Sequence, residues 1–283
     1  MSKSLYDKVQ KKKLLLFTLI LTIFSCSPGK KEEQSEEATT NEKSLVGEEV
    51  TYQTDSTTMK GYIAYDENME GTAPGIIVIH EWWGHNDYVR QRADMLAELG
   101  YVALAVDMYG EGKQADHPKD ASKFSGMVMG NLDVAKARFD QALATLKSNE
   151  KVNPDQIAAI GYCFGGSVAL TMANAGYDLD AVAAFHSGLQ LPIMPQEGIK
   201  AKILVCNGAD DPFIPAEQVA AFTAAMDSAK AEYEYIAYDS AVHAFTSPAA
   251  TEMGNKFDLP LAYNAEADSA SWEEMKELFS EVF

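Results

Sequence analysis

The chain has 283 residues, enough for one large domain or two small ones, and its 42 acidic residues outnumber 23 basic ones to give a formal net charge of −19. Such a surface repels nucleic-acid phosphates and anionic lipid headgroups, and no basic stripe relieves the repulsion. We therefore expect no nucleic-acid partner and no charge-driven attachment to a membrane.

The first 25 residues have the organisation of a secretory signal peptide. Lysines gather between residues 3 and 13, and residues 14–24 form an apolar run of about eleven residues, too short to span a bilayer stably. The sequence Ile-Phe-Ser-Cys that ends at Cys26 resembles the lipobox of bacterial lipoproteins, which implies that Cys26 is acylated and becomes the new N-terminus. An ordinary cleaved signal with an incidental cysteine is the alternative.

Residues 26–47 are polar and charged and contain no aromatic residue, so we expect a flexible tether. Residues 48–283 then form a single domain. Removal of residues 1–25, which carry five Lys and one Asp, leaves a net charge of −23. The expected protein is a monomeric lipoprotein of the bacterial cell envelope, periplasmic or surface-exposed, held to the membrane by lipid.

Short apolar runs alternate with amphipathic segments along the rest of the chain. The predicted strands are residues 51–54, 59–65, 75–81, 101–108, 156–162, 181–187, 201–208 and 232–239. The predicted helices are residues 86–99, 164–175, 216–231 and 269–282, together with residues 119–148 as one long helix or two broken near Gly130.

This alternation predicts an α/β fold of the α/β-hydrolase kind: a mostly parallel sheet with helices on both faces and an antiparallel pair at its start. Chemistry in such sheets lies beyond the carboxyl ends of the strands. The loops at residues 81–85, 108–118, 163–166, 208–215 and 240–247 are therefore the candidate site.

A thiol stands at the tip of the turn in "AAIGYCFGGSV" (158–168). Gly161, Cys163, Gly165 and Gly166 have the spacing of a nucleophile elbow, in which glycines allow a helix to pack closely on the preceding strand. The backbone N–H of Phe164 would face an oxyanion, and the helix dipole favours the thiolate. A buried structural cysteine is the alternative, since the spacing does not match a dinucleotide loop.

A nucleophilic thiol needs a base, and the base needs an orienting acid. "CNGADDPFIP" supplies Asp211, with Asp210 as the alternative, and "DSAVHAF" supplies His243 after the last predicted strand. Nucleophile, acid and histidine then follow one another in the chain order expected of this fold. Cys206 lies on a strand of its own, so a disulfide with Cys163 is not expected.

The segment "HEWWGH" (80–85) invites a zinc interpretation, yet its histidines are five residues apart and leave a strand, whereas the zinc motif needs them four apart on a helix. We expect no metal. Instead, the backbone N–H of Trp82 would complete an oxyanion hole, and Glu81 would lie close to Cys163.

Taken together, these motifs resemble the dienelactone hydrolase family of α/β-hydrolases over residues 49–283. The resemblance rests on "HEWWG" (80–84), "DMYG" (107–110), "GYCFGG" (161–166), Asp211-Pro212 and "HAF" (243–245). It implies hydrolysis of a small-molecule ester or lactone through a cysteine nucleophile, without a metal or organic cofactor. It also implies that Glu81 contacts the resting thiol until substrate displaces its carboxylate.

The sequence departs from the family pattern where the substrate is chosen. Members that cleave dienelactone carry an arginine four residues after the catalytic histidine, and Ser247 stands there. Lysines, but no arginine, occur at residues 113, 119 and 123, where the family has a second arginine. A carboxylesterase acting on acylated envelope or polysaccharide material is the alternative enzyme. A catalytically silent binding protein is the alternative of another class, which the intact set of Cys163, Asp211, His243 and Glu81 disfavours.

Overall fold

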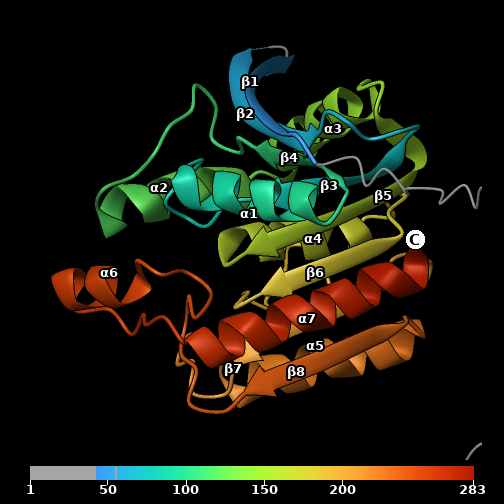
Figure 1. The fold of residues 1–283 in the computed structure, drawn as a ribbon. Coiled ribbons are helices and arrows are strands. Elements are labelled where there is room, and N and C mark those ends of the chain that lie inside the picture. The colour runs from blue at the N-terminus through green and yellow to red at the C-terminus, as the bar shows by residue number, and fades with distance from the viewer. Residues whose placement is uncertain (1–42, 55) are drawn as a thin grey trace, which may run out of the picture. The chain divides into compact units, whose positions relative to one another are not determined.

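The computed structural model describes residues 43–54 and 56–283 (Figure 1). This part of the chain contains an eight-stranded sheet. The predicted signal peptide (1–25), the predicted acylation of Cys26 and most of the predicted tether (26–47) lie outside the described residues and stay predictions.

The strands are β1 (Leu45–Thr54), β2 (Thr57–Asp66), β3 (Ala73–Ile79), β4 (Val102–Val106), β5 (Val152–Tyr162), β6 (Ala181–Phe185), β7 (Lys202–Gly208) and β8 (Tyr233–Tyr238). The helices are α1 (Asp87–Glu98), α2 (Pro118–Met129), α3 (Leu132–Lys147), α4 (Phe164–Asn174), α5 (Ala216–Ala229), α6 (Ala250–Phe257) and α7 (Ala265–Val282). The strand order is β1-β2-β4-β3-β5-β6-β7-β8, antiparallel from β1 to β4 and parallel from β4 to β8. The predicted α/β class, with a mostly parallel sheet in a single domain, is confirmed.

Helices cover both faces of the sheet, and α1 and α7 lie in front of it in Figure 1. The central strand β3 contributes to a core on each face of the sheet. Ile76 and Val78 face the core beneath α1 and α7, while Ile77 and Ile79 face the core that contains residues of α3, α4 and α5. A strand buried on both faces is continuously apolar, which is the pattern seen in its sequence.

Two helix boundaries follow from local capping. The 119–148 segment divides into α2 and α3 at Gly130, and the side chain of Asn131 accepts a hydrogen bond from the N–H of Val134 at the start of α3. The two-helix alternative is therefore the one observed. In α7 the side chain of Asn264 accepts a hydrogen bond from the N–H of Ala267, so the helix begins at Ala265, four residues before the predicted start.

Two other elements differ from expectation. β1 begins at Leu45, inside the predicted tether, because residues 45–47 pair with residues 64–66 of β2. Helix α6 was not predicted. It has only eight residues, whereas a helix is recognised from sequence by an apolar pattern over about ten residues or more.

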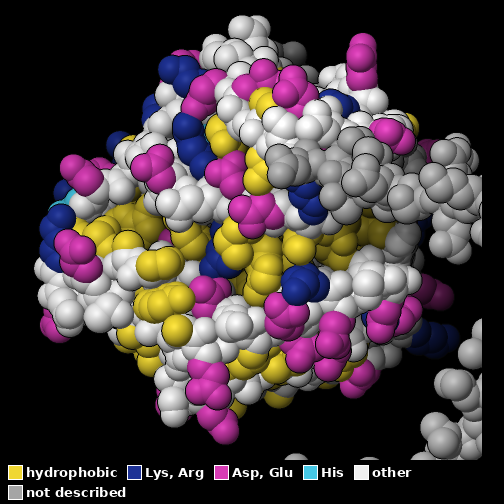
Figure 2. Space-filling view, in the orientation of Figure 1, with side chains coloured by type: hydrophobic (Ala, Val, Ile, Leu, Met, Phe, Trp, Pro, Cys, Tyr) yellow, Lys and Arg dark blue, Asp and Glu magenta, His cyan; other side chains and the backbone are white. Residues whose placement is uncertain are grey.

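Acidic side chains are spread over the molecular face in Figure 2 and outnumber basic ones there, in keeping with the net charge of −19. Among the described residues, none of the helices combines the length and apolar character needed to cross a membrane.

The turn between β5 and α4 is tightly constrained. Cys163 has φ 53° and ψ −114°, and its N–H donates to the carbonyl of Phe185 at 2.9 Å. A Cβ atom on Gly165 would lie 2.3 Å from the carbonyl oxygen of Ile79, and one on Gly166 would lie 1.7 Å from Ser187 Oγ. Only glycine allows α4 to approach the sheet this closely.

We predict that Gly165→Ala lowers the free energy of unfolding by about 3 kcal/mol, because backbone must move to admit the methyl group. Gly126→Ala is the matched control, since a Cβ there meets nothing within 4 Å. In a helix interior the control change should stabilise by about 0.5–1 kcal/mol. Urea unfolding measures both, and equal effects would contradict the close approach described for α4.

Candidate active site

Three side chains from distant parts of the chain meet above the carboxyl ends of the parallel strands. His243 Nε2 lies 3.0 Å from Cys163 Sγ, and His243 Nδ1 lies 2.7 Å from Asp211 Oδ2. Cys163 follows β5, Asp211 follows β7 and His243 follows β8, so each comes from a loop expected to form the site.

The neighbouring aspartates have different environments. The Asp211 side chain is fully buried, and its second carboxylate oxygen accepts a hydrogen bond from the N–H of Phe213 at 2.9 Å. Asp210 is exposed. Asp211 is therefore the partner of His243, and the alternative of Asp210 is set aside.

The charges around His243 favour its protonated form. Burial alone lowers the pKa of His243, but the charges and hydrogen bonds of Cys163 and Asp211 outweigh burial and raise the pKa to about 10. A protonated imidazole 3.0 Å from Sγ stabilises negative charge on the sulfur. This pairing can support nucleophilic attack followed by proton transfer from the same ring.

Glu81 follows β3 and is 4% exposed. Cys163 Sγ contacts His243, and no hydrogen bond joins it to the Glu81 carboxylate in the described chain. The expected contact between Glu81 and the resting thiol, and the gating of the thiol by Glu81, both stay predictions. Burial raises the pKa of Glu81 to about 7, although the positive charges of His243 and Arg92 oppose the rise.

The two residues predicted to donate to an oxyanion lie at the cavity that contains the sulfur. Trp82 and Phe164 both line the cavity that contains Cys163. Phe164 is the first residue of α4, so its N–H has no acceptor in the preceding turn of the helix. An anionic oxygen close to Sγ could therefore accept from this N–H, with the dipole of α4 adding to the attraction.

The turn that carries Trp82 is held by a buried histidine that sequence reasoning left without a role. His80 Nδ1 lies 2.6 Å from the Glu81 carbonyl, and His80 Nε2 accepts from the N–H of Met108 at 3.1 Å. Burial lowers the pKa of His80 to about 4, so the ring stays neutral with its proton on Nδ1. Tyr109 also donates to the Trp82 carbonyl at 3.0 Å. His80 therefore helps to position the turn that carries Trp82.

Within the part of the chain that the structure covers, no group of three or more His, Cys, Asp or Glu side chains could hold a metal ion. The second histidine of the "HEWWGH" segment, His85, bonds through Nε2 to the carbonyl of Ala105 at 3.2 Å.

A cavity of about 500 Å³ opens beside the sulfur. It is lined by Trp82, Ser122, Ser125, Gly126, Met129, Cys163, Phe164, Ser167, Gly188, Gln190, Phe213, Ile214, His243, Leu259 and Leu261. This lining contains no lysine or arginine, and Lys113, Lys119 and Lys123 are exposed elsewhere. Ser247 faces a separate, smaller cavity.

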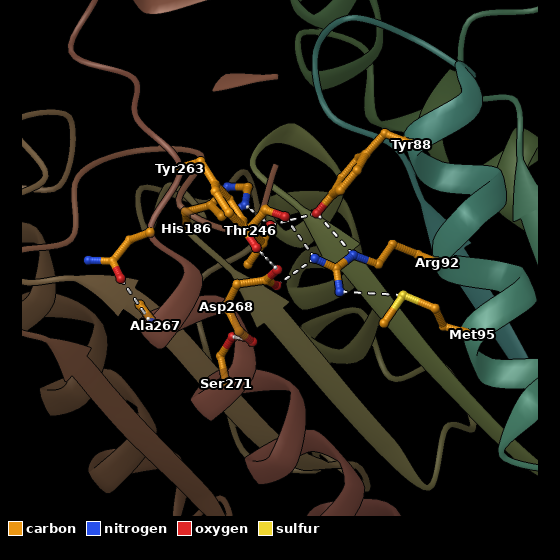
Figure 3. A network of polar contacts seen from close by, with 10 residues as sticks. Tyr88, Arg92, Met95, His186, Thr246, Tyr263, Ala267, Asp268 and Ser271 are labelled. Carbon is orange, nitrogen blue, oxygen red and sulfur yellow. Dashed lines mark hydrogen bonds and ion pairs between the residues drawn. The ribbon is translucent and has the colours of Figure 1, made fainter. Parts of the chain in front are cut away.

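The loop that carries His243 is supported by a buried cation (Figure 3). Arg92 of α1 is almost fully buried, and its guanidinium pairs with Asp268 of α7 and donates to the Thr246 carbonyl at 2.7 Å. Tyr88 reaches the Thr246 hydroxyl at 2.6 Å. Two helices that are far apart in sequence thus hold the loop that carries His243.

The same threonine connects this support to the site. His186 Nε2 lies 2.7 Å from Thr246 Oγ1, and the His186 ring packs edge-on against His243 with centroids 5.4 Å apart. Burial lowers the pKa of His186, so a neutral ring lies against the charged one. None of these contacts could be read from sequence, because no short motif joins their residues.

The second described cysteine differs from the first. Cys206 lies within β7, where Tyr238 donates to its sulfur at 3.5 Å and burial raises the pKa of the thiol to about 12. Both Cys163 and Cys206 are free thiols. Only Cys163 lies beside a base and a cavity.

A strained strand-to-helix turn on a mostly parallel sheet, followed along the chain by an aspartate and a histidine that meet at its tip, defines the α/β-hydrolase class. The chain belongs to the dienelactone hydrolase family, whose model matches residues 59–283.

The Aquifex pyrophilus protein usf is 30% identical over 205 residues, which cover 71% of this chain and 87% of that protein. The solved structure described as m3DLH is 36% identical with a TM-score of 0.80, covering 84% of this chain and 99% of its own. A dienelactone hydrolase-like promiscuous phosphotriesterase from metagenomic libraries is 34% identical, with a TM-score of 0.78 and the same coverage.

We predict that Arg92→Met lowers the free energy of unfolding by about 3–5 kcal/mol, because it leaves the Asp268 carboxylate without its buried partner. Arg90→Met is the matched control, since Arg90 pairs with an exposed Glu49. The control should cost less than about 1 kcal/mol. Urea unfolding at neutral pH distinguishes the two, and an equally small effect at Arg92 would rule out its role as a buried support.

We predict a pH-dependent gain in stability for Glu81→Gln. The pKa of Glu81 rises from 4.5 to about 7 on folding, so unfolding releases protons between these values and stability falls as pH rises through this window. Because glutamine does not ionise, the variant does not lose stability over this pH range. The variant should match the parent at pH 4 and exceed it by about 3 kcal/mol at pH 8. A constant difference across the pH range would show that Glu81 is not a desolvated carboxyl.

Proposed function

We propose that the protein hydrolyses carboxylic esters through Cys163, with His243 as the proton shuttle and Asp211 as its orienting acid. The observation that carries the proposal is the 3.0 Å contact between Cys163 Sγ and His243 Nε2 beside a cavity large enough for a substrate. A structural cysteine has no need of both a buried histidine–carboxylate pair and an open cavity.

In this mechanism the sulfur attacks the carbonyl carbon and the carbonyl oxygen becomes an oxyanion. The N–H groups of Trp82 and Phe164 would hold that oxyanion. His243 then gives its proton to the departing alcohol, and the C–O bond breaks as the thioester forms. Water then attacks the thioester carbonyl while His243 takes its proton. The C–S bond breaks, the carboxylic acid leaves, and the Cys163 thiolate and protonated His243 are restored.

The cavity favours esters that carry no negative charge near the scissile bond. No lysine or arginine lines it, and aromatic and aliphatic side chains such as Met129, Phe213 and Leu259 form much of its wall. A carboxylate-bearing lactone would find no guanidinium fork there. We therefore propose neutral esters, a class that includes acylated envelope or polysaccharide material, ahead of dienelactone.

The test is turnover of p-nitrophenyl butyrate by the full chain. Cys163→Ala and His243→Ala should each lower kcat by about 1,000-fold or more, because the residues act as one unit. Cys206→Ala is the control for loss of a thiol and should keep most of the activity. Activity that persists in Cys163→Ala would overturn the mechanism. Failure of the parent protein on a broad ester and lactone panel would favour a binding protein.

A comparison of an uncharged and an anionic ester tests the proposed preference for uncharged substrates. The kcat/KM for p-nitrophenyl butyrate should exceed that for the mono-p-nitrophenyl ester of succinate, which carries a carboxylate, by about tenfold or more. A preference for the anionic ester would contradict this proposal and favour dienelactone-like substrates instead.

A further inference from the structure

A second cavity of about 160 Å³ lies behind the proposed catalytic site. Its lining residues are Glu81, Trp83, Asn86, Tyr88, Ala115, Ala244, Ser247, Ala249, Ala250, Met253 and Leu261. Leu261 also lines the larger cavity, and Glu81 and Ala244 are the chain neighbours of Trp82 and His243, which line it too. The two cavities are thus adjacent, with catalytic residues between them.

The acyl-transfer steps proposed above assign no step to the Glu81 carboxylate, which lines this second cavity. Glu81 is 4% exposed, yet in the described chain its carboxylate forms no ion pair and no hydrogen bond. Arg92 is near enough for its field to reach Glu81, but its guanidinium is taken by Asp268 and the Thr246 carbonyl. A buried carboxylate without a bonded partner is costly, so a cation beside it would be stabilised.

The rest of the lining suits an organic cation better than a hydrated metal ion. Trp83 and Tyr88 supply aromatic rings, which attract ammonium groups, and the Tyr88 ring already has the Arg92 guanidinium 5.2 Å from its centroid. Met253 and Ala250 supply apolar contact for alkyl groups. Asn86 and Ser247 add the only other polar side chains. A mixture of one carboxylate, aromatic rings and methyl groups is the chemistry that recognises alkylammonium.

The volume sets the size of the ligand. A cavity of about 150 Å³ holds a molecule the size of benzene, with about six heavy atoms. Tetramethylammonium and the head of a choline ester are in this range. The net charge of −19, visible as acidic side chains over the face in Figure 2, also raises the local concentration of cations.

We propose that this cavity binds a compact alkylammonium group, with Glu81 as its counter-ion and Trp83 and Tyr88 as aromatic contacts. The cation could be a free amine that binds beside the catalytic residues, or the ammonium arm of the ester being cleaved. The second source rests on the proposed hydrolase function, and the first does not.

Binding is tested with tetramethylammonium chloride and the full chain by isothermal titration calorimetry at pH 8, with sodium chloride of equal ionic strength as the blank. We expect saturable binding that Glu81→Gln weakens at least tenfold. Ser247→Arg, which would place a tethered guanidinium in the same cavity, should also abolish it. Glu277→Gln removes an exposed carboxylate on α7 and should change nothing. No saturable heat, or equal binding by the parent and Glu81→Gln, would overturn the proposal.

The pH dependence gives a second readout. His243 and Arg92 are the charged groups whose fields reach Glu81, and both stay protonated between pH 5 and pH 8 because the pKa of His243 is raised to about 10. The pKa of Glu81 is about 7, so affinity should fall about 50-fold or more from pH 8 to pH 5. Affinity that is unchanged over this range would exclude Glu81 as the counter-ion.

The source of the cation is decided by two esters of nearly equal shape, acetylcholine and its uncharged analogue 3,3-dimethylbutyl acetate. A lower KM for acetylcholine that Glu81→Gln removes would assign the cavity to the substrate. Equal KM values together with tetramethylammonium binding would assign it to a free cation. If neither ester is cleaved while tetramethylammonium still binds, the hydrolase proposal fails and the cation site stands.

Discussion

The close packing of α4 against the end of β3 is the constraint on which the site depends. It holds Cys163 at φ 53° above the sheet and leaves the first N–H of α4 beside the sulfur. The other partners come from β7 and β8, which run parallel to β5 and end at the same edge of the sheet. A helix set back by the width of one methyl group would move the thiol away from the imidazole of His243.

Buried charges around this turn are arranged in pairs, and the pairs have different tasks. The Asp211 carboxylate bonds to the His243 ring, which faces the sulfur. The pair of Arg92 and Asp268 holds the loop from which that ring projects. Glu81 is the buried carboxylate between these two pairs that has no bonded partner of its own. Burial raises the pKa of Glu81, because no bonded partner offsets the loss of water around its charged form.

Sequence predicted the parts whose chemistry is local. Glycine spacing located the turn at Cys163, and apolar runs located the strands whose loops supply Asp211 and His243. The contacts of Arg92 could not be predicted, because its partners Thr246 and Asp268 are 154 and 176 residues away and belong to no shared motif. Helix α6 escaped prediction since it has only eight residues, fewer than the about ten or more by which helices are recognised from sequence. The charge state of Glu81 likewise depends on burial, which the letters "HEWWG" do not encode.

The short segment that contains α6 has a separate consequence. It connects the His243 loop to α7, forms one isolated bridge between His243 and Leu261, and contributes walls to both cavities, yet supplies none of the three converging side chains. Residues 248–262 could therefore diverge among homologues, or be exchanged by grafting, with the reactive centre left intact. A library of variants confined to residues 248–262 would be an efficient way to search for new substrate selectivity.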